Sequence, residues 1–174
     1  MALKKLVADG SMYVWSLLRI ALGFIFLWAF FDKLFGLGVS TCAGKGVSCS
    51  AAWLEGGSPT AGFLGRAVTG PFSDFYHNLA GLAWVDWAFM LGLLVAGVGL
   101  LLGIFVRFAS FTGIVVLVLM WTALLWPKNT PGIDEHIIYA LVLFGVALSD
   151  ENQMWSLRGW WIKTGVAKAL PFLR

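Results

Sequence analysis

The fold is decided by residues 82–106, LAWVDWAFMLGLLVAGVGLLLGIFV, a stretch of 25 residues in which Asp86 is the only charged side chain. About 20 apolar residues in a helix cross the roughly 30 Å hydrocarbon layer of a lipid bilayer. The whole chain is similarly apolar, since 60% of its 174 residues are hydrophobic and 12% are charged, whereas about 25% of the residues of soluble domains are charged. The sequence therefore predicts a small, all-α integral membrane protein embedded in a lipid bilayer.

Three further apolar segments complete a predicted bundle of four transmembrane helices within a single domain, residues 1–174. Residues 13–35 supply the first span, with Ser11 as its predicted N-cap, and residues 108–126 supply the third. The fourth, residues 133–151, has an apolar part of 14 residues, which is about 21 Å of helix at 1.5 Å per residue. To cross a bilayer, this helix must bring the polar residues at its start to the membrane edge.

The distribution of Lys and Arg predicts which side of the membrane each end of the chain occupies, because these residues accumulate in cytoplasmic loops. If the termini are cytoplasmic, that side carries eight of them and the outer side carries four, namely Lys33, Lys45, Arg66 and Lys128. Both termini are therefore predicted to be cytoplasmic, with the protein in a bacterial or archaeal plasma membrane. The net charge of +3 is scattered along the chain, which excludes nucleic acid as an expected partner.

Two segments are predicted to lie outside the bundle. Residues 37–80 form a long outer loop that contains too many aromatic residues to be disordered, and loops of this length are usually functional or disordered. We expect this loop to cover the outer face as a lid with two short helices, residues 60–68 and 71–79. Residues 152–174 combine Trp with Lys and Arg at helical spacing, which predicts an amphipathic helix on the inner membrane surface.

Polar side chains from several segments are predicted to meet at the outer membrane edge. Lys33 ends the first span, Asp86 opens the second, and Asp134 and His136 open the fourth. These residues form either a salt-bridge network that locks the helices together or a pocket for a quinone. In the pocket, Lys33 or His136 donates a hydrogen bond to the quinone carbonyls and the acids accept protons. The predicted aromatic walls of the pocket are Trp84, Trp87 and Trp126.

Arg19 and the two cysteines carry further predictions. Arg19 lies within the first span, where a charged group is costly, so it either extends to the inner interface or pairs with Asp150 or Glu151. Cys42 and Cys49 lie in the Gly-rich part of the outer loop, where the oxidising environment favours a disulfide. This disulfide is either a structural cross-link or a redox-active pair. The spacing of the cysteines and histidines matches no zinc pattern, and no metal site is predicted.

Four stretches of the chain resemble one family of membrane proteins. Residues 18–26, LRIALGFIF, and residues 31–36, FDKLFG, resemble the opening helix of the DoxX/DoxD family. Residues 56–64, GGSPTAGFL, and residues 126–139 are similar to the branch of that family described as the membrane subunit of thiosulfate:quinone oxidoreductase. The resemblance implies a four-helix subunit that works with a quinone of the menaquinone or ubiquinone type and with a second protein subunit.

The function implied by the resemblance is the transfer of electrons from a sulfur substrate, thiosulfate or a thiol, to membrane quinone at the outer face. Whether this chain is itself catalytic stays open, because thiosulfate oxidation in the family requires the second subunit. The alternative is a non-catalytic accessory subunit of a respiratory or membrane redox complex. In that case the polar cluster at the outer edge only holds the helices together.

Overall fold

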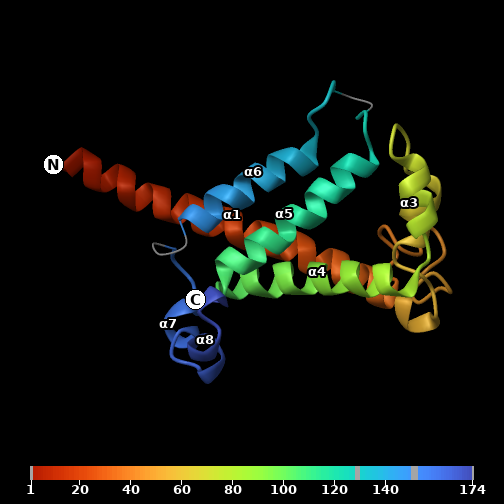
Figure 1. Ribbon diagram of the computed structural model, residues 1–174. Coiled ribbons are helices and arrows are strands. Elements are labelled where there is room, and N and C mark those ends of the chain that lie inside the picture. Colours follow the sequence, from red (N-terminus) through yellow and green to blue (C-terminus); the bar gives the residue numbers. More distant parts are fainter. Residues whose placement is uncertain (1, 128–129, 150–152, 174) are drawn as a thin grey trace.

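The computed structural model describes residues 2–127, 130–149 and 153–173, and its regular structure in these ranges is entirely helical (Figure 1). The long helices are α1 (Ala2–Phe35), α4 (Ala83–Leu102), α5 (Val106–Ala123) and α6 (Glu135–Leu148). The short helices are η1 (Trp53–Glu55), α2 (Ala61–Arg66), α3 (Ser73–Leu79), α7 (Arg158–Trp161), α8 (Gly165–Ala169) and η3 (Pro171–Leu173).

Among the described residues, three helices are long and apolar enough to cross a membrane, namely Gly10–Phe35 of α1, α4 and α5. Helix α6 is also apolar but has 14 residues, about 21 Å of helix. Large apolar side chains cover the outward faces of these helices, for example Phe24, Leu91, Phe111 and Leu141. So much exposed apolar surface indicates a multi-pass protein in a lipid bilayer, since soluble monomers rarely expose large apolar patches.

Several helix boundaries differ from the sequence prediction. Helix α5 covers Val106–Ala123 instead of residues 108–126, and α6 begins at Glu135 instead of residue 133. Helix α1 begins at Ala2, so the prediction that Ser11 caps its start is wrong. The residues that precede Ser11 include good helix formers and no proline, and they extend the helix by nine residues. Helix α4 ends at Leu102, before the predicted end at residue 106, because Gly103 adopts the left-handed conformation with φ of 67° and ends the helix.

Helices α1 and α4 cross at close range because glycine occupies the contact on both of them. A Cβ atom at Gly23 would lie 2.6 Å from the backbone nitrogen of Leu101, and a Cβ atom at Gly97 would lie 2.8 Å from that of Leu27. Small residues at helix contacts allow such close approach between transmembrane helices. The buried core then lies between α1, α4, α5 and α6, with Leu22, Phe26, Leu100, Leu143 and Val146 among its residues.

Arg19 joins three parts of the fold at one end of the bundle. Its side chain is fully buried, and its guanidinium donates hydrogen bonds to the carbonyl oxygens of Leu100 and Leu101 at the end of α4. It also donates to the carbonyl oxygens of Met154 and Trp155, at 3.1 Å and 2.9 Å. A cation at the carboxyl end of a helix is favourable because the last carbonyls have no partner within the helix. The side chain therefore does not extend to the interface. The predicted pairing with Asp150 or Glu151 lies outside the described residues.

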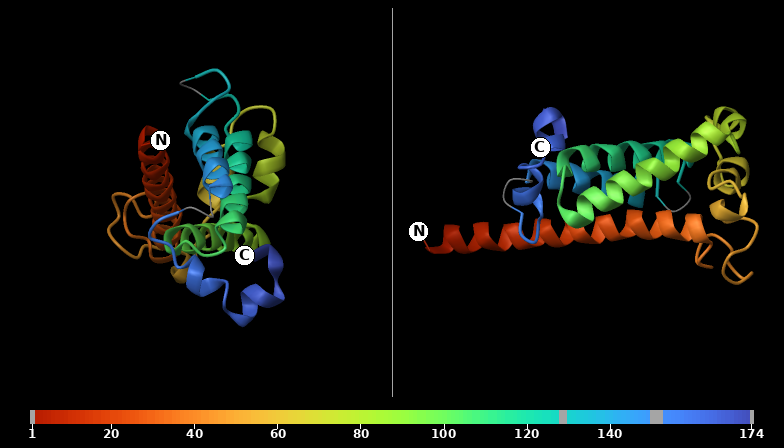
Figure 2. Two further views of the ribbon diagram at one scale, coloured as in Figure 1. Left: turned by 90° about the vertical axis from the view of Figure 1, so that its left-hand side faces the viewer. Right: turned by 90° about the horizontal axis from the view of Figure 1, so that it is seen from below.

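At the other end of the bundle, the chain leaves α1 by turning around the carboxylate of Asp32. This carboxylate accepts hydrogen bonds from the backbone N–H groups of residues 39–41 and from the hydroxyl of Ser40, at 2.7 Å to 3.2 Å. The next residues contain the disulfide between Cys42 and Cys49, which confirms the predicted pairing of the two cysteines. Residues 36–82 gather at this end, away from both termini (Figure 2).

The short helices follow the sequence prediction in one segment and depart from it in the other. Helices α2 and α3 lie within the predicted ranges of residues 60–68 and 71–79. The prediction of one amphipathic helix over residues 152–174 is wrong, since α7 and α8 are separate. The break has a local cause, because the hydroxyl of Thr164 caps α8 by accepting a hydrogen bond from the backbone nitrogen of Ala167.

Candidate functional site

A cavity of about 650 Å³ lies between α4, α5 and residues 58–79, which we call the α2–α3 segment. The walls come from one side of α4 between residues 84 and 92, from one side of α5 between residues 108 and 120, and from the α2–α3 segment. Among the residues that the structure describes, Lys33 of α1 is the only charged one in this lining. The twelve-residue separation along α5 corresponds to about 18 Å of helix, so the cavity is long and runs with the helices.

The α2–α3 segment is fixed to α4 through the carboxylate of Asp86. The Oδ1 atom of Asp86 accepts hydrogen bonds from the Ser58 hydroxyl at 2.8 Å, the Thr60 backbone nitrogen at 3.1 Å and the Thr60 hydroxyl at 2.6 Å. Both Thr60 and Asp86 are buried. Hydrogen bonds to an ionised acceptor are stronger than those between neutral groups, so Asp86 holds α2 at the start of α4.

The same segment is fixed to α5 through Tyr76. Its hydroxyl donates a hydrogen bond to the carbonyl oxygen of Leu119 at 3.1 Å and lies 2.6 Å from the hydroxyl oxygen of Thr122. The ring of Tyr76 is buried in a cluster that also contains Leu64, Val68 and Ala123. The α2–α3 segment, which supplies part of the cavity wall, is therefore fixed to both of the long helices that supply the rest.

Lys33 is the residue that gives the cavity its chemistry. Its ammonium nitrogen lies 6.0 Å from the centre of the Phe89 ring, and its side chain is half-buried. No other described residue gives this ammonium a hydrogen bond or a close ion pair. The neighbouring acid, Asp32, uses both carboxylate oxygens to hold the backbone of residues 39–41. An ammonium beside an apolar cavity and without such a partner favours a ligand that brings an oxygen acceptor.

Some of the predicted site residues line the cavity, and others lie elsewhere in the structure. Lys33 and Trp84 line the cavity, whereas Asp86 is outside its lining and binds the α2–α3 segment. Trp87 instead packs against Trp53 of η1, with ring centres 4.7 Å apart. Trp126 is 70% exposed and is not part of the cavity wall. Of the predicted site residues, Lys33 and Trp84 therefore share the lining of this cavity.

Asp134 and His136 form a separate cluster at the start of α6. One oxygen of Asp134 accepts from the backbone nitrogens of His136 and Ile137, at 3.0 Å and 3.4 Å, and the other lies 2.8 Å from Nδ1 of His136. With Glu135, these residues place three possible metal-ligand atoms within 4.8 Å of one another. The contacts of the first oxygen are those of an N-cap, and the second oxygen pairs with the His136 ring.

Comparison of the chain with protein-family models, with curated proteins and with solved structures finds no match. The resemblance to the DoxX/DoxD family therefore stays a prediction that rests on the residues of this chain. What the chain can do has to be argued from the cavity itself.

The sequence did not reveal which residues of α5 form the cavity wall. Phe108, Phe111 and Leu119 line it, but in the sequence they are ordinary apolar residues of a membrane span. Tyr76 also went unnoticed, although a tyrosine in an otherwise apolar loop helix needs a partner for its hydroxyl when it is buried. That requirement is the one signal in the sequence that pointed to a contact between the loop and a span.

Proposed function

We propose that this chain is the membrane subunit of a quinone-linked oxidoreductase, which passes electrons from a sulfur substrate, thiosulfate or a thiol, to membrane quinone at the outer face. The observation that carries the proposal is the ammonium of Lys33 at the wall of a long apolar cavity. A quinone has the two features that such a site selects. It has carbonyl oxygens on a flat ring, and it has a long apolar tail.

The residues present fit a quinone of the menaquinone or ubiquinone type. The ring lies near Lys33, which donates a hydrogen bond to a carbonyl oxygen, and the side chains of Trp84 and Phe89 provide apolar surfaces beside it. The tail follows α5 toward Phe108, over about 18 Å. When bound, the quinone supplies the capacity to take up two electrons and two protons. The chain's own part is to hold the ring and to exclude water with the α2–α3 segment.

The proposal includes four membrane crossings with both termini in the cytoplasm of a bacterial or archaeal cell. It is supported by the Lys and Arg distribution and by the position of residues 36–82 at the end of the molecule away from both termini (Figure 2). In this arrangement α6 is the fourth crossing and the α2–α3 segment is a lid on the outer face. A second protein subunit that oxidises the sulfur substrate would approach from that side.

The test is the quinone content of the full chain purified in mild detergent from quinone-producing bacteria. The variants are Lys33→Met, which removes the donor, and Ala88→Trp, which fills the cavity; the control is Lys45→Met in the outer loop. Loss of a hydrogen bond from a charged donor costs about 1.5–3 kcal/mol, or one to two decades in affinity. We expect quinone in the wild type and in Lys45→Met and little in the other two. Equal quinone content in all four proteins, or none in the wild type, would contradict the proposal.

A non-catalytic accessory subunit is the second candidate, and the positions of the acids favour it. Asp86 binds Ser58 and Thr60, and Asp134 binds the start of α6. Neither is directed to accept protons from a ligand beside Lys33. Turnover of the native membrane complex separates the two candidates: Lys33→Met lowers quinone reduction if the chain is catalytic and leaves it unchanged if the chain is only an accessory subunit.

A further inference from the structure

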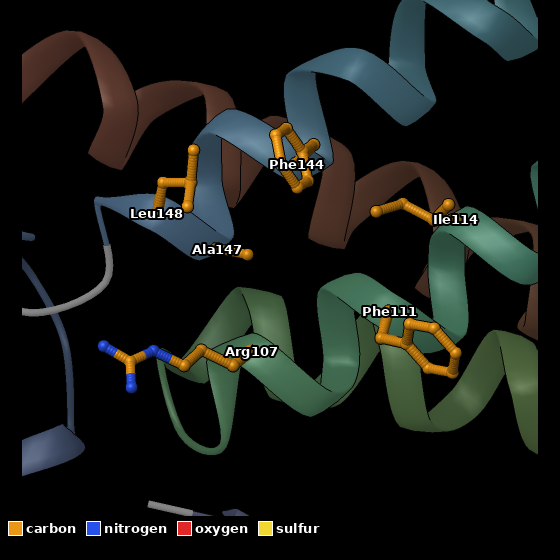
Figure 3. Close-up of a pocket in the computed structure, with 6 residues that line it drawn as sticks. All are labelled: Arg107, Phe111, Ile114, Phe144, Ala147 and Leu148. Atoms are coloured by element: carbon orange, nitrogen blue, oxygen red, sulfur yellow. The ribbon is translucent and has the colours of Figure 1, made fainter.

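A second groove lies between α5 and α6 and shares one lining residue, Phe111, with the cavity described above. Its volume is about 350 Å³, and it is lined by Arg107, Phe111, Ile114, Phe144, Ala147 and Leu148 (Figure 3). It opens on the outside of the helices, because Phe111, Phe144 and Leu148 are each more than half exposed. In a membrane this groove faces the lipid, and its apolar walls suit a hydrocarbon chain.

Arg107 sets this groove apart from an ordinary gap between two transmembrane helices. It is the second residue of α5, and Figure 3 shows its side chain at the end of the groove near Leu148, where α6 finishes. An exposed guanidinium at this level lies where phospholipid phosphates meet the hydrocarbon layer. Its planar array of donors matches phosphate oxygens better than an ammonium does. The groove therefore combines a place for an acyl chain with a donor for the headgroup.

The chain that follows α6 contains two acidic residues, Asp150 and Glu151, and is then basic. Residues 152–174 contain Arg158, Lys163, Lys168 and Arg174 and no acidic residue. Phe172 packs against Phe108, with ring centres 5.9 Å apart, so this segment lies beside the first turn of α5. Basic residues next to a membrane attract anionic lipids by about 1 kcal/mol each. This charge selects an anionic headgroup over a zwitterionic one.

We propose that the α5–α6 groove is a binding site for one anionic phospholipid, with an acyl chain between Phe111 and Phe144 and the phosphate at Arg107. The two ends of the groove fit this occupant. Arg107 and Ile114 are seven residues apart, about 10 Å along α5, so the groove holds the part of an acyl chain nearest the headgroup. The rest of the chain continues into the surrounding bilayer. Phe111 is the one described lining residue that this groove shares with the quinone cavity.

Native mass spectrometry of the full chain in nanodiscs made from equal amounts of phosphatidylglycerol and phosphatidylcholine tests the proposal. We expect the wild type to retain one phosphatidylglycerol in preference to phosphatidylcholine. Arg107→Gln should lower that preference about tenfold or more, since it removes a charge-assisted contact. Ala147→Trp fills the groove and should remove the retained lipid of either kind. Lys45→Gln, a change of the same charge in the loop at the other end of the molecule, should keep the preference.

Two results would overturn the proposal. One is equal retention of the two lipids by the wild type, which would show that the groove takes any bilayer lipid. The other is a lowered melting temperature of Arg107→Gln with an unchanged lipid ratio, which would show that Arg107 serves the protein's own structure. Arg107→Lys separates charge from geometry, because it should recover part of the preference if the phosphate is the partner.

Discussion

The hydroxyl of Thr60 is predicted to control how tightly α2 is held over the quinone cavity. It donates to Asp86 at 2.6 Å, and the two residues are only 4% and 6% exposed. Thr60→Val keeps the branched shape of the side chain and removes the donor. A hydrogen bond to a charged group contributes about 1.5–3 kcal/mol. The free energy of local opening of the α2–α3 segment should fall by this amount, which raises its opening equilibrium about 10- to 150-fold.

Hydrogen exchange of the full chain in detergent measures this opening. The backbone nitrogen of Leu64 donates to the Thr60 carbonyl at 2.8 Å and that of Ala67 donates to Phe63 at 2.9 Å, so both amides report on α2. Their exchange should accelerate in Thr60→Val, while amides within α5 keep their rates. Thr69→Val is the control, because Thr69 is an exposed threonine between α2 and α3.

A double-mutant cycle shows whether the effect acts through Asp86. In an Asp86→Asn background the acceptor is neutral, and the further cost of Thr60→Val should drop to about 0.5–1.5 kcal/mol. Unchanged exchange at Leu64 and Ala67 in Thr60→Val would refute the argument, because it would mean that apolar packing alone holds α2. An effect of the same size in both backgrounds would mean that Thr60 acts through some other neighbour.

Three further predictions concern residues outside the cavity. Replacing both Cys42 and Cys49 by Ser should destabilise the outer loop by about 2–3 kcal/mol in the chain-entropy model; proteolysis of the loop should quicken while circular dichroism of the helices is unchanged. Arg19→Met leaves several helix-end carbonyls without a donor and should cost about 3 kcal/mol or more, seen as a large drop in melting temperature. Asp134→Ala removes the N-cap of α6 and should cost about 0.5–2 kcal/mol, with quinone content of the purified protein unchanged.

The helices were predictable because apolar length is a local property of the sequence. A run such as residues 82–106 has one stable environment, the bilayer, and its ends shift only by local turns such as the one at Gly103. The pairing of Cys42 with Cys49 was predictable for a similar reason, since a chain with two cysteines has one possible intramolecular disulfide. The break between α7 and α8 was not predictable in this way. The helical spacing of charges and aromatic residues indicated one helix, but the N-cap at Thr164 begins a new one.

The candidate site was less predictable because topology gives depth in the membrane but not direction around each helix. Asp86, Asp134 and His136 were all expected at the outer edge near Lys33. Asp86 and Asp134 had nearer partners within a few ångströms, the hydroxyls of the α2–α3 segment for one and the first turn of α6 for the other. Local hydrogen bonds of this kind form at little cost in chain entropy. The carboxylates that make them are then not available for an ion pair with a distant residue such as Lys33.

Arg19 and Lys33 show why neighbours decide what a charge in a membrane helix does. Both belong to the same span of α1, fourteen residues apart, with Lys33 close to its end and Arg19 in its first half. Arg19 is buried among the carbonyl oxygens of α4 and of residues 154–155, so its donors are already used to hold the fold together. Lys33 faces a ring at 6.0 Å and an apolar cavity, and its one adjacent acid is engaged elsewhere. A charge whose partners belong to the protein stabilises the structure, whereas one that faces a cavity without them is available to a ligand, and this difference directs the search for function to Lys33.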